Sequence, residues 1–500
     1  MEAHRHRTSV QGPVPDAIAV STRSTDRGFA WSICNDSGVP VEVHSVSAVC
    51  TLTGITGRVR MFRNGWQSWS ETSVATLGVD EDPALTPGAL ELMRMSHHAD
   101  SALPAADRLR SEMATVLCDD RGAVLAGFLG GDLHDGTIWL AHGRTGQELR
   151  IQAFLGGAVM APGEHRDLHE VRLEAVADAN EALADWAAEY GRRQLARTGS
   201  PYQLGWCSWY HYFENVGETD VRENLSAAAD WPIEVFQVDD GFQSAVGDWL
   251  STDESFPAGL AAIGSSIGDA GVRPGLWLAP FLAAPDSALA QKHPDWIARV
   301  PGGDPLIAMY NDHWGGFVHT LDTSHPDVQL HLEGLARAVV EMGFSYLKLD
   351  FTYAPAMAGE DHDTAMTPAQ RVRAGYDAIR RGEGLEAYGS DTSDPQASRV
   401  LREVLAGKVP LRIQARIQQD IETALRLTDE FSLSFTLEEA TEAYRCIDAL
   451  QARSVPVIFG PIYARPHGLR ARSSESRRSR YYTFGALIEA GITTALSAQE

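Results

Sequence analysis

Two patterns of apolar and polar residues follow one another along the chain. Up to about residue 180, short runs alternate between apolar and polar positions and are broken by Gly, Asp and Asn. Beyond Tyr202, apolar runs of strand length alternate with runs that repeat with a helical period. A period of two predicts half-buried strands, and a period near 3.6 predicts amphipathic helices. The sequence therefore predicts an all-β part followed by an α/β part.

The first part has turn residues at close spacing between its alternating runs. Strands spaced in this way are typical of an all-β sandwich, and we predict one over residues 1–180. Its clearest predicted strands are Phe29–Cys34, Val41–Val49, Ala114–Cys118, Ala123–Phe128, Thr137–Ala141 and Glu148–Ala153.

The second part repeats strand, loop and helix after a bridging helix at Asn180–Leu195. Repeated βα units give a parallel sheet with right-handed crossovers, either closed as a barrel or doubly wound. The predicted strands are Leu204–Trp209, Ile233–Val238, Pro274–Leu278 and Phe344–Phe351, and the predicted helices are Val221–Ala229, Leu260–Ala270 and Val328–Met342.

The strand Phe344–Phe351 delivers a charged pair, Lys348 and Asp350, near its C-terminal end. Residues two apart on a strand share a face, and the C-terminal strand ends form the catalytic face of a β/α barrel. A carboxylate there, with a cation beside it, is a candidate for an active site. The alternative is a strand-terminal Asp that caps the next helix.

Other polar and aromatic residues also fall at predicted strand ends. Asp239 and Asp240 are adjacent, so on a strand they point apart and do not form a proton-sharing pair. In a loop they could grip two hydroxyls or a divalent metal, and no second cluster of Asp, Glu or His at metal spacing accompanies them, which favours hydroxyls. Trp209, Tyr210 and Trp277 are expected to wall the same pocket, so the ligand predicted is neutral and rich in hydroxyls.

A polar and aromatic loop, Phe62–Ser70, lies inside the all-β part and contains Trp66 and Trp69. An exposed Trp beside amide side chains suits a sugar, whose C–H face packs on the ring while its hydroxyls form directed hydrogen bonds. The alternative is a pair of core tryptophans beneath a loop.

Chain length, net charge and cysteine content bound the number of domains and exclude several classes of partner. Five hundred residues predict two or three domains, and a net charge of -25 argues against nucleic acid and anionic membranes, which both select a basic face. Five widely spaced cysteines without a Cys-x-x-Cys predict reduced thiols and a cytoplasmic location. No apolar stretch follows Met1 as in a secretion signal, and none is long enough to span a bilayer. The sequence leaves open whether the protein forms a homo-oligomer.

Six motifs in order resemble glycoside hydrolase family 36, the α-galactosidase and raffinose-synthase-like enzymes. The resemblance runs from near the start of the chain to about residue 382. Its motifs are the loop Asn64–Ser70 and the segments Gly205–Tyr210, Gln237–Gly241, Gly275–Pro280, Leu321–Pro326 and Lys348–Phe351.

The resemblance implies a β-supersandwich followed by a (β/α)8 barrel of the TIM type, and hydrolysis of terminal α-galactosides, such as raffinose and melibiose, with retention of configuration. Asp350 falls on the family's nucleophile, and no cofactor or metal is implied. Asp239, Asp240 and Lys348 fall on residues that hold sugar hydroxyls. The aromatic residues that would line the sugar pocket are Trp209, Tyr210, Trp277 and, from the sandwich, Trp66.

Beyond residue 382 the family pattern stops. The segments Leu411–Arg416, Ser434–Tyr444 and Val455–Gly460 resemble the later strands of amidohydrolase-superfamily proteins of the imidazolonepropionase type. Gln414 or Arg416 and Glu438-Glu439 stand where that superfamily places metal ligands, so a hydrolytic metal site is not expected. Residues 181–382 and 383–500 would each supply about half of a hybrid or incomplete barrel. Gene fusion, recombination and an assembly artefact all explain such a join.

The join leaves the acid/base of the reaction open. In the family this Asp lies beyond the join, and Ser390–Asp394 only imitates its motif, with Asp391 as the candidate. The alternative is a simple turn. Three functions therefore stand side by side: an α-galactosidase impaired by loss of its acid, a non-catalytic carbohydrate-binding protein, and an amidohydrolase-type hydrolase disfavoured by its missing ligands.

Overall fold

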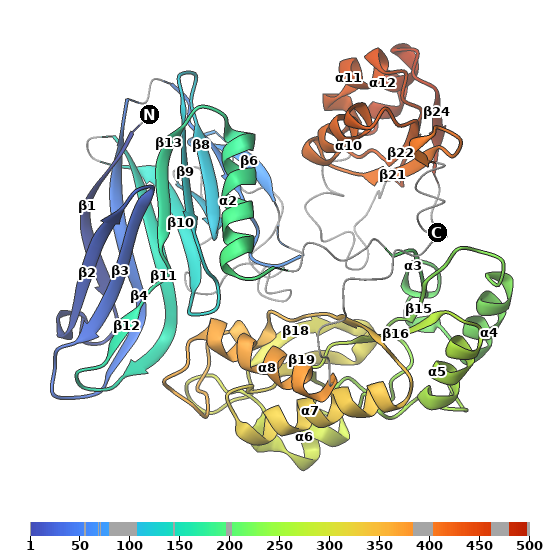
Figure 1. The fold of residues 1–500 in the computed structure, drawn as a ribbon, viewed down its shortest axis with the longest axis horizontal. Helices are drawn as coiled ribbons and strands as arrows, with labels where there is room; N and C mark the ends of the chain where they lie inside the picture. Colours follow the sequence, from blue (N-terminus) through green and yellow to red (C-terminus); the bar gives the residue numbers. More distant parts are fainter. Residues whose placement is uncertain are drawn as a thin grey trace. The chain divides into compact units, whose positions relative to one another are not determined.

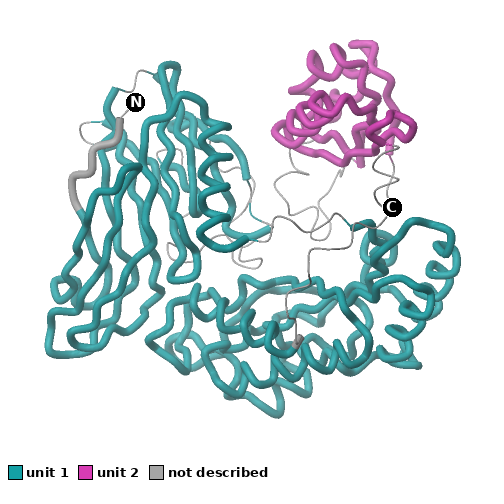
Figure 2. Tube along the Cα trace, viewed as in Figure 1, with its two compact units in different colours: residues 1–81, 90–390 teal, residues 82–89, 391–500 magenta. Residues whose placement is uncertain are grey.

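The structure is a computed structural model that describes residues 2–54, 57–68, 70, 72–79, 108–143, 146–196, 203–383, 404–461 and 480–497. The chain divides into two compact units, coloured separately in Figure 2. The described residues up to Glu383 belong to the first unit, and those from Val404 onward belong to the second.

The all-β prediction corresponds to two antiparallel sheets, which we call the two-sheet domain (Figure 1). The first sheet has the strand order β1 (Glu2–Gln11), β4 (Val41–Thr53), β11 (Gln147–Met160), β10 (Asp135–His142) and β7 (Arg108–Glu112). The second has the order β12 (His165–Asp167), β3 (Gly28–Asn35), β13 (Val171–Val176), β9 (Ala123–Phe128), β8 (Ala114–Cys118), β5 (Arg60–Arg63) and β6 (Ser73–Thr76), with β2 (Ile18–Thr25) paired to β3.

One apolar core lies between these sheets. Ile138 and Ile151 from the first sheet and Ile33 and Phe128 from the second are all fully buried in the same cluster. Because successive side chains of a strand point to opposite faces, the alternation read in the sequence supplies one apolar face from each sheet. The predicted strand Ala114–Cys118 is confirmed residue for residue as β8.

Helix α2 (Ala179–Arg193) closes the second sheet on its outer side (Figure 1). Its N-terminus is capped by the Asp178 side chain, which accepts hydrogen bonds from the N–H groups of Asn180 and Glu181. Trp186 packs over Gly127 of β9 and donates a 3.0 Å hydrogen bond to the carbonyl of Phe128. The predicted bridging helix is therefore confirmed, and it is anchored to the sheet.

The α/β part of the first unit is built on a four-stranded parallel sheet in the order β14 (Gly205–Cys207), β15 (Val235–Val238), β16 (Arg273–Leu278) and β20 (Tyr346–Leu349). Each of the four predicted strands is confirmed, although β14 is shorter than predicted because Trp209 already begins a helix. The helices are α3 (Trp209–Tyr212), α4 (Glu218–Ala227), α5 (Leu260–Asp269), α6 (Ala288–Lys292), α7 (Pro326–Glu341) and α8 (Pro368–Glu383).

A small antiparallel sheet interrupts the βα repeat between β16 and α7. It holds β17 (Leu282–Ala283), β19 (Gly316–Thr320) and β18 (Ile307–Asn311) in that order. The turn Asp312–Trp314 connects β18 to β19, and it places Trp314 beside the carboxyl ends of the parallel strands, as its contacts below demonstrate.

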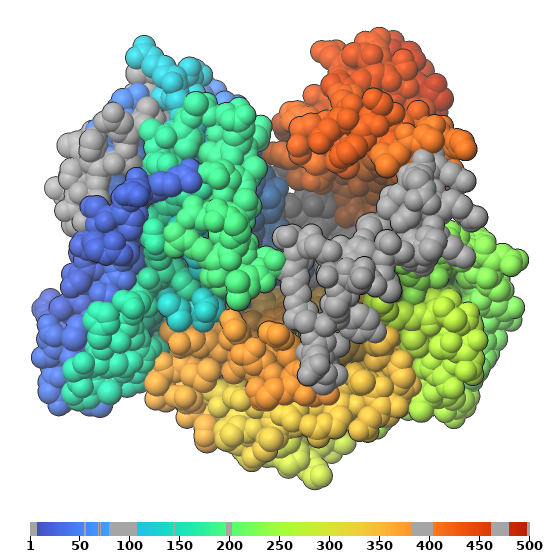
Figure 3. Space-filling view, in the orientation of Figure 1, coloured from blue at the N-terminus to red at the C-terminus, as the bar shows by residue number. Residues whose placement is uncertain are grey.

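Backbone and side-chain contacts join the two-sheet domain to the segment before α8. The N–H of Val159 donates to the carbonyl of Thr364 (2.8 Å), and the Thr367 hydroxyl donates to the carbonyl of Leu133 (2.6 Å). Figure 3 shows the resulting surface, where the orange segment of α8 lies against the teal and cyan residues of the two-sheet domain. The two parts of the first unit therefore form one body.

The second unit holds a separate four-stranded parallel sheet, β21 (Leu411–Ala415), β22 (Phe435–Glu439), β23 (Val457–Phe459) and β24 (Thr494–Leu496). Helices α10 (Gln418–Glu430), α11 (Ile447–Ala452) and α12 (Thr483–Glu489) accompany it, with a core of its own around Ile421, Leu437 and Phe459. Parallel strands and helices thus alternate in the described part of the second unit, whereas the assignment of residues 383–500 as half of a barrel and a closed eight-stranded barrel both stay predictions.

Candidate active site

Strand register places the predicted polar residues on one face of the first parallel sheet. Trp277 of β16 lies opposite Lys348 of β20, and Gln237 of β15 lies opposite Gly275. Asp239 follows Gln237 by two residues and therefore shares its face at the level of Trp277. Asp350 follows Lys348 in the same way. Four of the predicted side chains consequently gather at the carboxyl end of this sheet.

Two of these residues form an ion pair. Lys348 Nζ lies 2.9 Å from Asp239 Oδ2, and only 2% of the Asp239 side chain is exposed. The Asp239 carboxylate also accepts hydrogen bonds from the Gln237 amide and from the Cys207 thiol at 3.3 Å. Burial disfavours the charge on Lys348, but the hydrogen bond and the charge of Asp239 outweigh it, so the pKa of Lys348 is raised. Lys348 therefore keeps its positive charge beside Asp239 over the ordinary pH range.

The Asp350 carboxylate is held by two N–H donors. Trp277 Nε1 donates to Oδ2 at 3.1 Å, and the backbone N–H of Phe351 donates to Oδ1 at 2.8 Å. Phe351 has a φ of 50°, in the left-handed region that non-glycine residues rarely adopt. Strain of this kind is common where a backbone must present a group in a fixed direction. Asp350 therefore keeps its carboxylate oriented at the end of β20.

Asp240 faces different partners from its neighbour. Its carboxylate accepts hydrogen bonds from Gln243 Nε2 at 2.6 Å and from Trp314 Nε1 at 3.0 Å, and the residue is 4% exposed. Burial raises the pKa of Asp240 to about 6, although the hydrogen bonds from Gln243 and Trp314 lower it. The expectation that Asp239 and Asp240 point apart therefore agrees with their separate hydrogen-bond partners.

Tryptophan side chains surround these carboxylates. The Trp277 ring centroid lies 5.6 Å from that of Trp249 and 6.0 Å from that of Trp314, and Trp314 contacts Phe351 at 5.2 Å. We did not predict roles for Trp249 and Trp314 from the sequence. Both lie in segments without a motif, and only their long-range contacts connect them to the site.

A cavity of about 370 Å³ lies beside Asp350, on the side facing the two-sheet domain. Trp66, Gln67 and Ser68 of the predicted aromatic loop contribute to its lining, and Trp66 packs edge-on against Tyr353 at 5.3 Å. Asp135 at the start of β10 lines the same cavity, and no feature of the sequence indicated this. The structure thus brings Trp66 and Asp350 to one cavity.

The two remaining aromatic candidates lie elsewhere. Trp209 and Tyr210 begin α3, where Trp209 packs edge-on against Phe213 at 5.3 Å and Tyr210 is 73% exposed. Of the predicted site residues, Trp66 and Asp350 line the cavity beside Asp350, whereas Trp209, Tyr210, Trp277, Asp239, Asp240 and Lys348 do not. The acid/base candidate Asp391 lies outside the described residues, as does Trp69.

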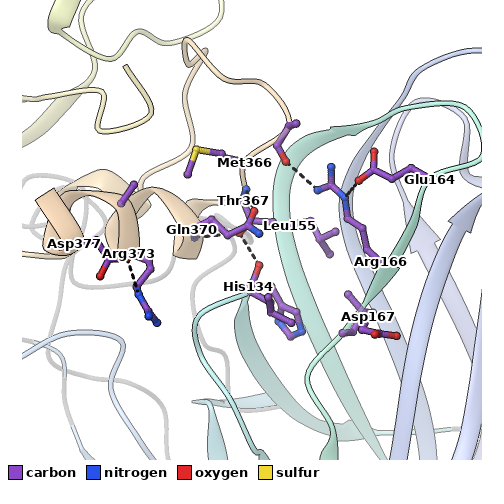
Figure 4. Close-up of a pocket in the computed structure, with 14 residues that line it drawn as sticks. His134, Leu155, Glu164, Arg166, Asp167, Met366, Thr367, Gln370, Arg373 and Asp377 are labelled. Carbon is purple, nitrogen blue, oxygen red and sulfur yellow. Dashed lines mark hydrogen bonds and ion pairs between the residues drawn. The ribbon is translucent and has the colours of Figure 1, made fainter. Parts of the chain in front are cut away.

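A larger cavity, about 710 Å³, lies between the two-sheet domain and α8 (Figure 4). None of the predicted site residues lines it. Arg373 is paired with Asp377 at 3.0 Å, and Arg166 bonds Glu164 and the carbonyl of Ala365. Because these charged side chains already bond one another or the backbone, the cavity belongs to the joint between the two parts of the first unit.

The second unit pairs its acidic residues with arginines. Arg412 bonds Glu438, and Glu439 accepts hydrogen bonds from Gln414 and Arg416. Gln414 or Arg416 and Glu438-Glu439 are the residues that stand where an amidohydrolase would carry metal ligands, and that resemblance stays a prediction. Among the residues that the structure describes, no group of three His, Cys, Asp or Glu side chains could hold a metal ion. The described helices include none that is both long and apolar enough to cross a membrane.

Residues 192–374, which include all four strands of the first parallel sheet, match the melibiase family model. An α-galactosidase of Escherichia coli is 25% identical over 232 residues, covering 41% of this chain and 32% of that enzyme. The α-galactosidase AgaA of Geobacillus stearothermophilus is 30% identical over 171 residues, covering 31% and 23% respectively. The chain thus spans a third or less of the length of these curated relatives.

Solved structures extend the similarity over the rest of the fold. An α-galactosidase from Thermus thermophilus, in complex with p-nitrophenyl α-D-galactopyranoside, has a TM-score of 0.55 and 25% identity, covering 94% of each chain. The glycoside hydrolase family 36 enzyme AgaA, in complex with stachyose, has a TM-score of 0.51 at 16% identity, which shows the fold alone over 73% of this chain and 52% of that one. Residues 192–374 therefore carry a melibiase-type domain, in a chain similar to the α-galactosidases of glycoside hydrolase family 36.

Proposed function

We propose that this chain is a retaining glycoside hydrolase of the α-galactosidase type, with Asp350 as its nucleophile. The observation that carries the proposal is the position of Asp350. Its carboxylate ends a parallel strand, is oriented by Trp277 and by the N–H of Phe351, and borders a cavity of about 370 Å³. The match of residues 192–374 to the melibiase model supports the same reaction.

The ion pair and the neighbouring carboxylate would bind the terminal sugar. Asp239 and Lys348 offer an acceptor and a donor at fixed positions, and Asp240 offers a second acceptor. Trp277 is 1% exposed and donates its N–H to Asp350, so it would orient the nucleophile, whereas Trp66 in the cavity lining would offer an apolar surface to the sugar ring. A neutral, hydroxyl-rich ligand satisfies these groups, and galactosides bound to the Thermus thermophilus relative favour a terminal α-galactoside, of which raffinose and melibiose are examples.

The reaction would proceed in two steps. An oxygen of Asp350 attacks the anomeric carbon while the glycosidic C–O bond breaks, and the departing oxygen takes a proton from a second carboxyl group. Water then attacks the same carbon, gives its proton to that second group, and releases Asp350. Retaining enzymes place the two carboxyl groups about 5–5.5 Å apart. The sequence offers Asp391 for the second role, and the cavity beside Asp350 adds Asp135 as another candidate.

Hydrolysis of p-nitrophenyl α-galactoside tests this proposal, because that leaving group needs little protonation. Asp350→Ala should abolish turnover, and Asp350→Asn should abolish turnover while keeping sugar binding measurable by calorimetry. Equal rates in wild type and both variants would remove Asp350 from the mechanism. Sugar binding by a wild-type chain that shows no turnover would indicate a carbohydrate-binding protein instead.

A cytoplasmic location is part of the same proposal. All five cysteines are free, and Cys50 and Cys446 are buried. A reducing compartment would keep them so. Mass spectrometry of the protein after rapid alkylation in its host would test this, with five modified thiols expected in the denatured chain.

A further inference from the structure

The first sheet of the two-sheet domain has an unusual outer face. Its inner face is apolar: Ile138, Leu140, Leu149 and Ile151 are fully buried in the core. The residues between them point the other way, and they are mainly polar. A sheet of this kind normally exposes its polar face to water, yet several of these side chains are buried.

Register aligns these residues into adjoining rows. Trp139 of β10 lies opposite Arg110 of β7 and Arg150 of β11, and Thr137 lies opposite Glu112 and Gln152. Trp139 is therefore the aromatic centre of a face that is otherwise built of amides, hydroxyls, guanidinium groups and carboxylates.

A chain of hydrogen bonds runs across four strands of this face. Trp139 Nε1 donates to Gln152 Oε1 at 3.2 Å, and Gln152 Nε2 donates to Ser45 Oγ at 2.9 Å. The Ser45 hydroxyl donates in turn to Gln11 Oε1 at 2.7 Å. Ser45 and Gln152 are 1% and 5% exposed. Burying polar groups in this way costs free energy unless each is bonded, and the bonds fix the direction of every remaining donor and acceptor.

Charged groups flank the other side of Trp139. The guanidinium carbons of Arg108 and Arg110 lie 5.2 and 5.4 Å from the Trp139 ring centroid. Arg110 Nε lies 3.4 Å from Glu112 Oε1, and the Thr137 hydroxyl donates to Glu112 Oε2 at 2.7 Å. Both side chains of the Arg110–Glu112 pair are at most 10% exposed. Trp139 is therefore held rigidly between polar partners on both sides.

A cavity of about 320 Å³ opens on this face. Trp139 and Gln152 are buried in it, whereas Gln11 and Arg150 are exposed at its edge, so the cavity is open to solvent. Its polar and aromatic lining consists of Gln11, Arg108, Trp139, Glu148, Arg150 and Gln152, of which Trp139 and Gln152 already bond each other.

We propose that this cavity is a second carbohydrate site, which binds one sugar residue without cleaving it. Arg108 and Arg150 supply donors and Glu148 supplies an acceptor in the same lining, and ring hydroxyls use both kinds of group. Guanidinium and amide groups donate and accept in fixed directions, as ring hydroxyls require, and Trp139 adds one apolar edge. A volume near 300 Å³ is at the lower end of small-molecule sites, which fits a single sugar residue.

This site is distinct from the cavity beside Asp350. Asp135 begins β10 and lines the cavity beside Asp350, whereas Ala141 lines the second cavity six residues farther along. Trp139, at the centre of the second cavity, is four residues from Asp135, so at about 3.4 Å per residue the two positions on β10 lie roughly 14 Å apart. The proposal therefore stands whether or not Asp350 is a nucleophile.

Binding to the full-length chain tests the proposal, with the first site silenced by Asp239→Asn. Galactose and sucrose, the two parts of raffinose, serve as probes in calorimetric and saturation-transfer titrations. We expect at least one of them to bind saturably at millimolar concentration to the Asp239→Asn chain. Arg150→Ala in that background should weaken this binding about tenfold or more, the effect of losing one charge-assisted hydrogen bond. Glu148→Gln provides a second, nearly isosteric variant in case Arg150→Ala is poorly folded.

Arg23→Ala is the matched control, because Arg23 is an exposed arginine on β2 that does not line the cavity. It should leave binding unchanged. Failure of both sugars to bind the Asp239→Asn chain, together with a stoichiometry of one sugar or fewer in titrations of the wild-type chain, would overturn the proposal. Binding that neither Arg150→Ala nor Glu148→Gln weakens, with unchanged thermal midpoints, would do the same. A loss of p-nitrophenyl galactoside hydrolysis in Asp350→Ala concerns the first site only, so the two proposals fail separately.

Discussion

Lys348 Nζ lies 2.9 Å from Asp239 Oδ2, although strand β16 separates the strands that carry these two residues. Neighbouring strands are about 4.8 Å apart, so this ion pair spans roughly 10 Å between backbones. On β16, Gly275 shares the face of Trp277, and a Cβ there would come within 3.1 Å of Gln237, whose amide donates to the same Asp239 carboxylate. The pair therefore depends on the register of three strands at once.

Removing this lysine should be costly for stability. Lys348→Met leaves the Asp239 carboxylate buried without its cation, and breaking one side of a buried pair costs about 3–5 kcal/mol. Partial exposure of Lys348 places the expected value at the lower end. Urea unfolding measures the change, and Arg337→Ala is the control. Arg337 forms an exposed pair with Glu333 at 2.7 Å, and its loss should cost less than about 1 kcal/mol. Similar costs for the two variants would contradict the prediction.

Asp240 should make both stability and activity depend on pH. Its pKa is raised to about 6 by burial, above the value near 3.9 of an unfolded Asp. Between these values the folded chain binds more protons than the unfolded chain, so stability falls as pH rises from about 4 to 6. Asp240→Asn should remove this slope and should be more stable than wild type above pH 6. Unfolding titrations at intervals between pH 4 and 7 measure both effects.

The same carboxyl group should set the acidic limb of the activity profile. If Asp240 accepts hydrogen bonds from sugar hydroxyls as a carboxylate, as we propose, kcat/KM for p-nitrophenyl α-galactoside should rise towards a plateau above about pH 6. Asp240→Asn should lower the plateau and shift or flatten this limb. A limb that stays at the same pH in Asp240→Asn would assign it to another group.

Arg371 is expected to hold the loop that follows Asp350. It is 3% exposed, and its guanidinium donates to the carbonyls of Pro355 (3.1 Å) and Met357 (2.8 Å) and pairs with Asp361 at 2.5 Å. That loop includes Tyr353, which contacts Trp66 in the cavity beside Asp350. Arg371→Lys keeps the charge but cannot reach three partners, so it should lower both stability, by about 3 kcal/mol, and kcat/KM.

Arg373 provides a control for Arg371 on the same helix. Its side chain is 55% exposed and pairs with Asp377. Arg373→Lys should change the free energy of unfolding by less than about 1 kcal/mol. A double-mutant cycle of Arg371→Lys with Trp66→Phe then distinguishes an effect on the position of Tyr353 and Trp66 from a general loss of stability. If Arg371 acts through Tyr353 and Trp66, its effect on KM should shrink in the Trp66→Phe background, and strict additivity would contradict this role.

The sequence predicted the elements better than their contacts. Apolar runs between turn residues identified β15 and β16 because these parallel strands are buried on both faces, and the same pattern identified β20 although it is partly exposed. The same pattern extended β14 through Trp209, because a run of apolar and aromatic residues does not mark where the chain turns into α3.

The candidate site shows the same limit. Asp239, Lys348 and Asp350 could be grouped in advance because each ends a strand, and parallel strands end at one edge. Trp314 could not be grouped with the site from the sequence, because its hydrogen bond to Asp240 joins residues 74 apart in the chain. Asp135 could not either, because it belongs to the all-β part and reaches the cavity only through the joint with α8. Contacts between distant segments depend on packing, which periodicity does not encode.

The last prediction concerns the proton donor, and it follows from the division of work between the two carboxyl groups. The nucleophile attacks carbon, whereas the acid protonates the departing oxygen, and general acid catalysis contributes about 10²–10⁴-fold. A nitrophenolate departs without that help, but a sugar alkoxide does not. If the second carboxyl group is missing, the chain should cleave p-nitrophenyl α-galactoside and act very slowly on melibiose and raffinose. Azide should then accelerate release of the glycosyl-enzyme, because it needs no general base.

Comparable rates on aryl and natural substrates would instead mean that an acid is present. Asp391→Ala and Asp135→Asn then identify it, since loss of the acid should slow melibiose cleavage far more than nitrophenyl galactoside cleavage. Glu438 and Glu439 are weaker candidates, because both carboxylates already bond arginine side chains. If added azide restores the rate of only one of these variants, the residue replaced in that variant is the one that activates water. If neither variant changes the ratio of the two rates, neither residue donates the proton.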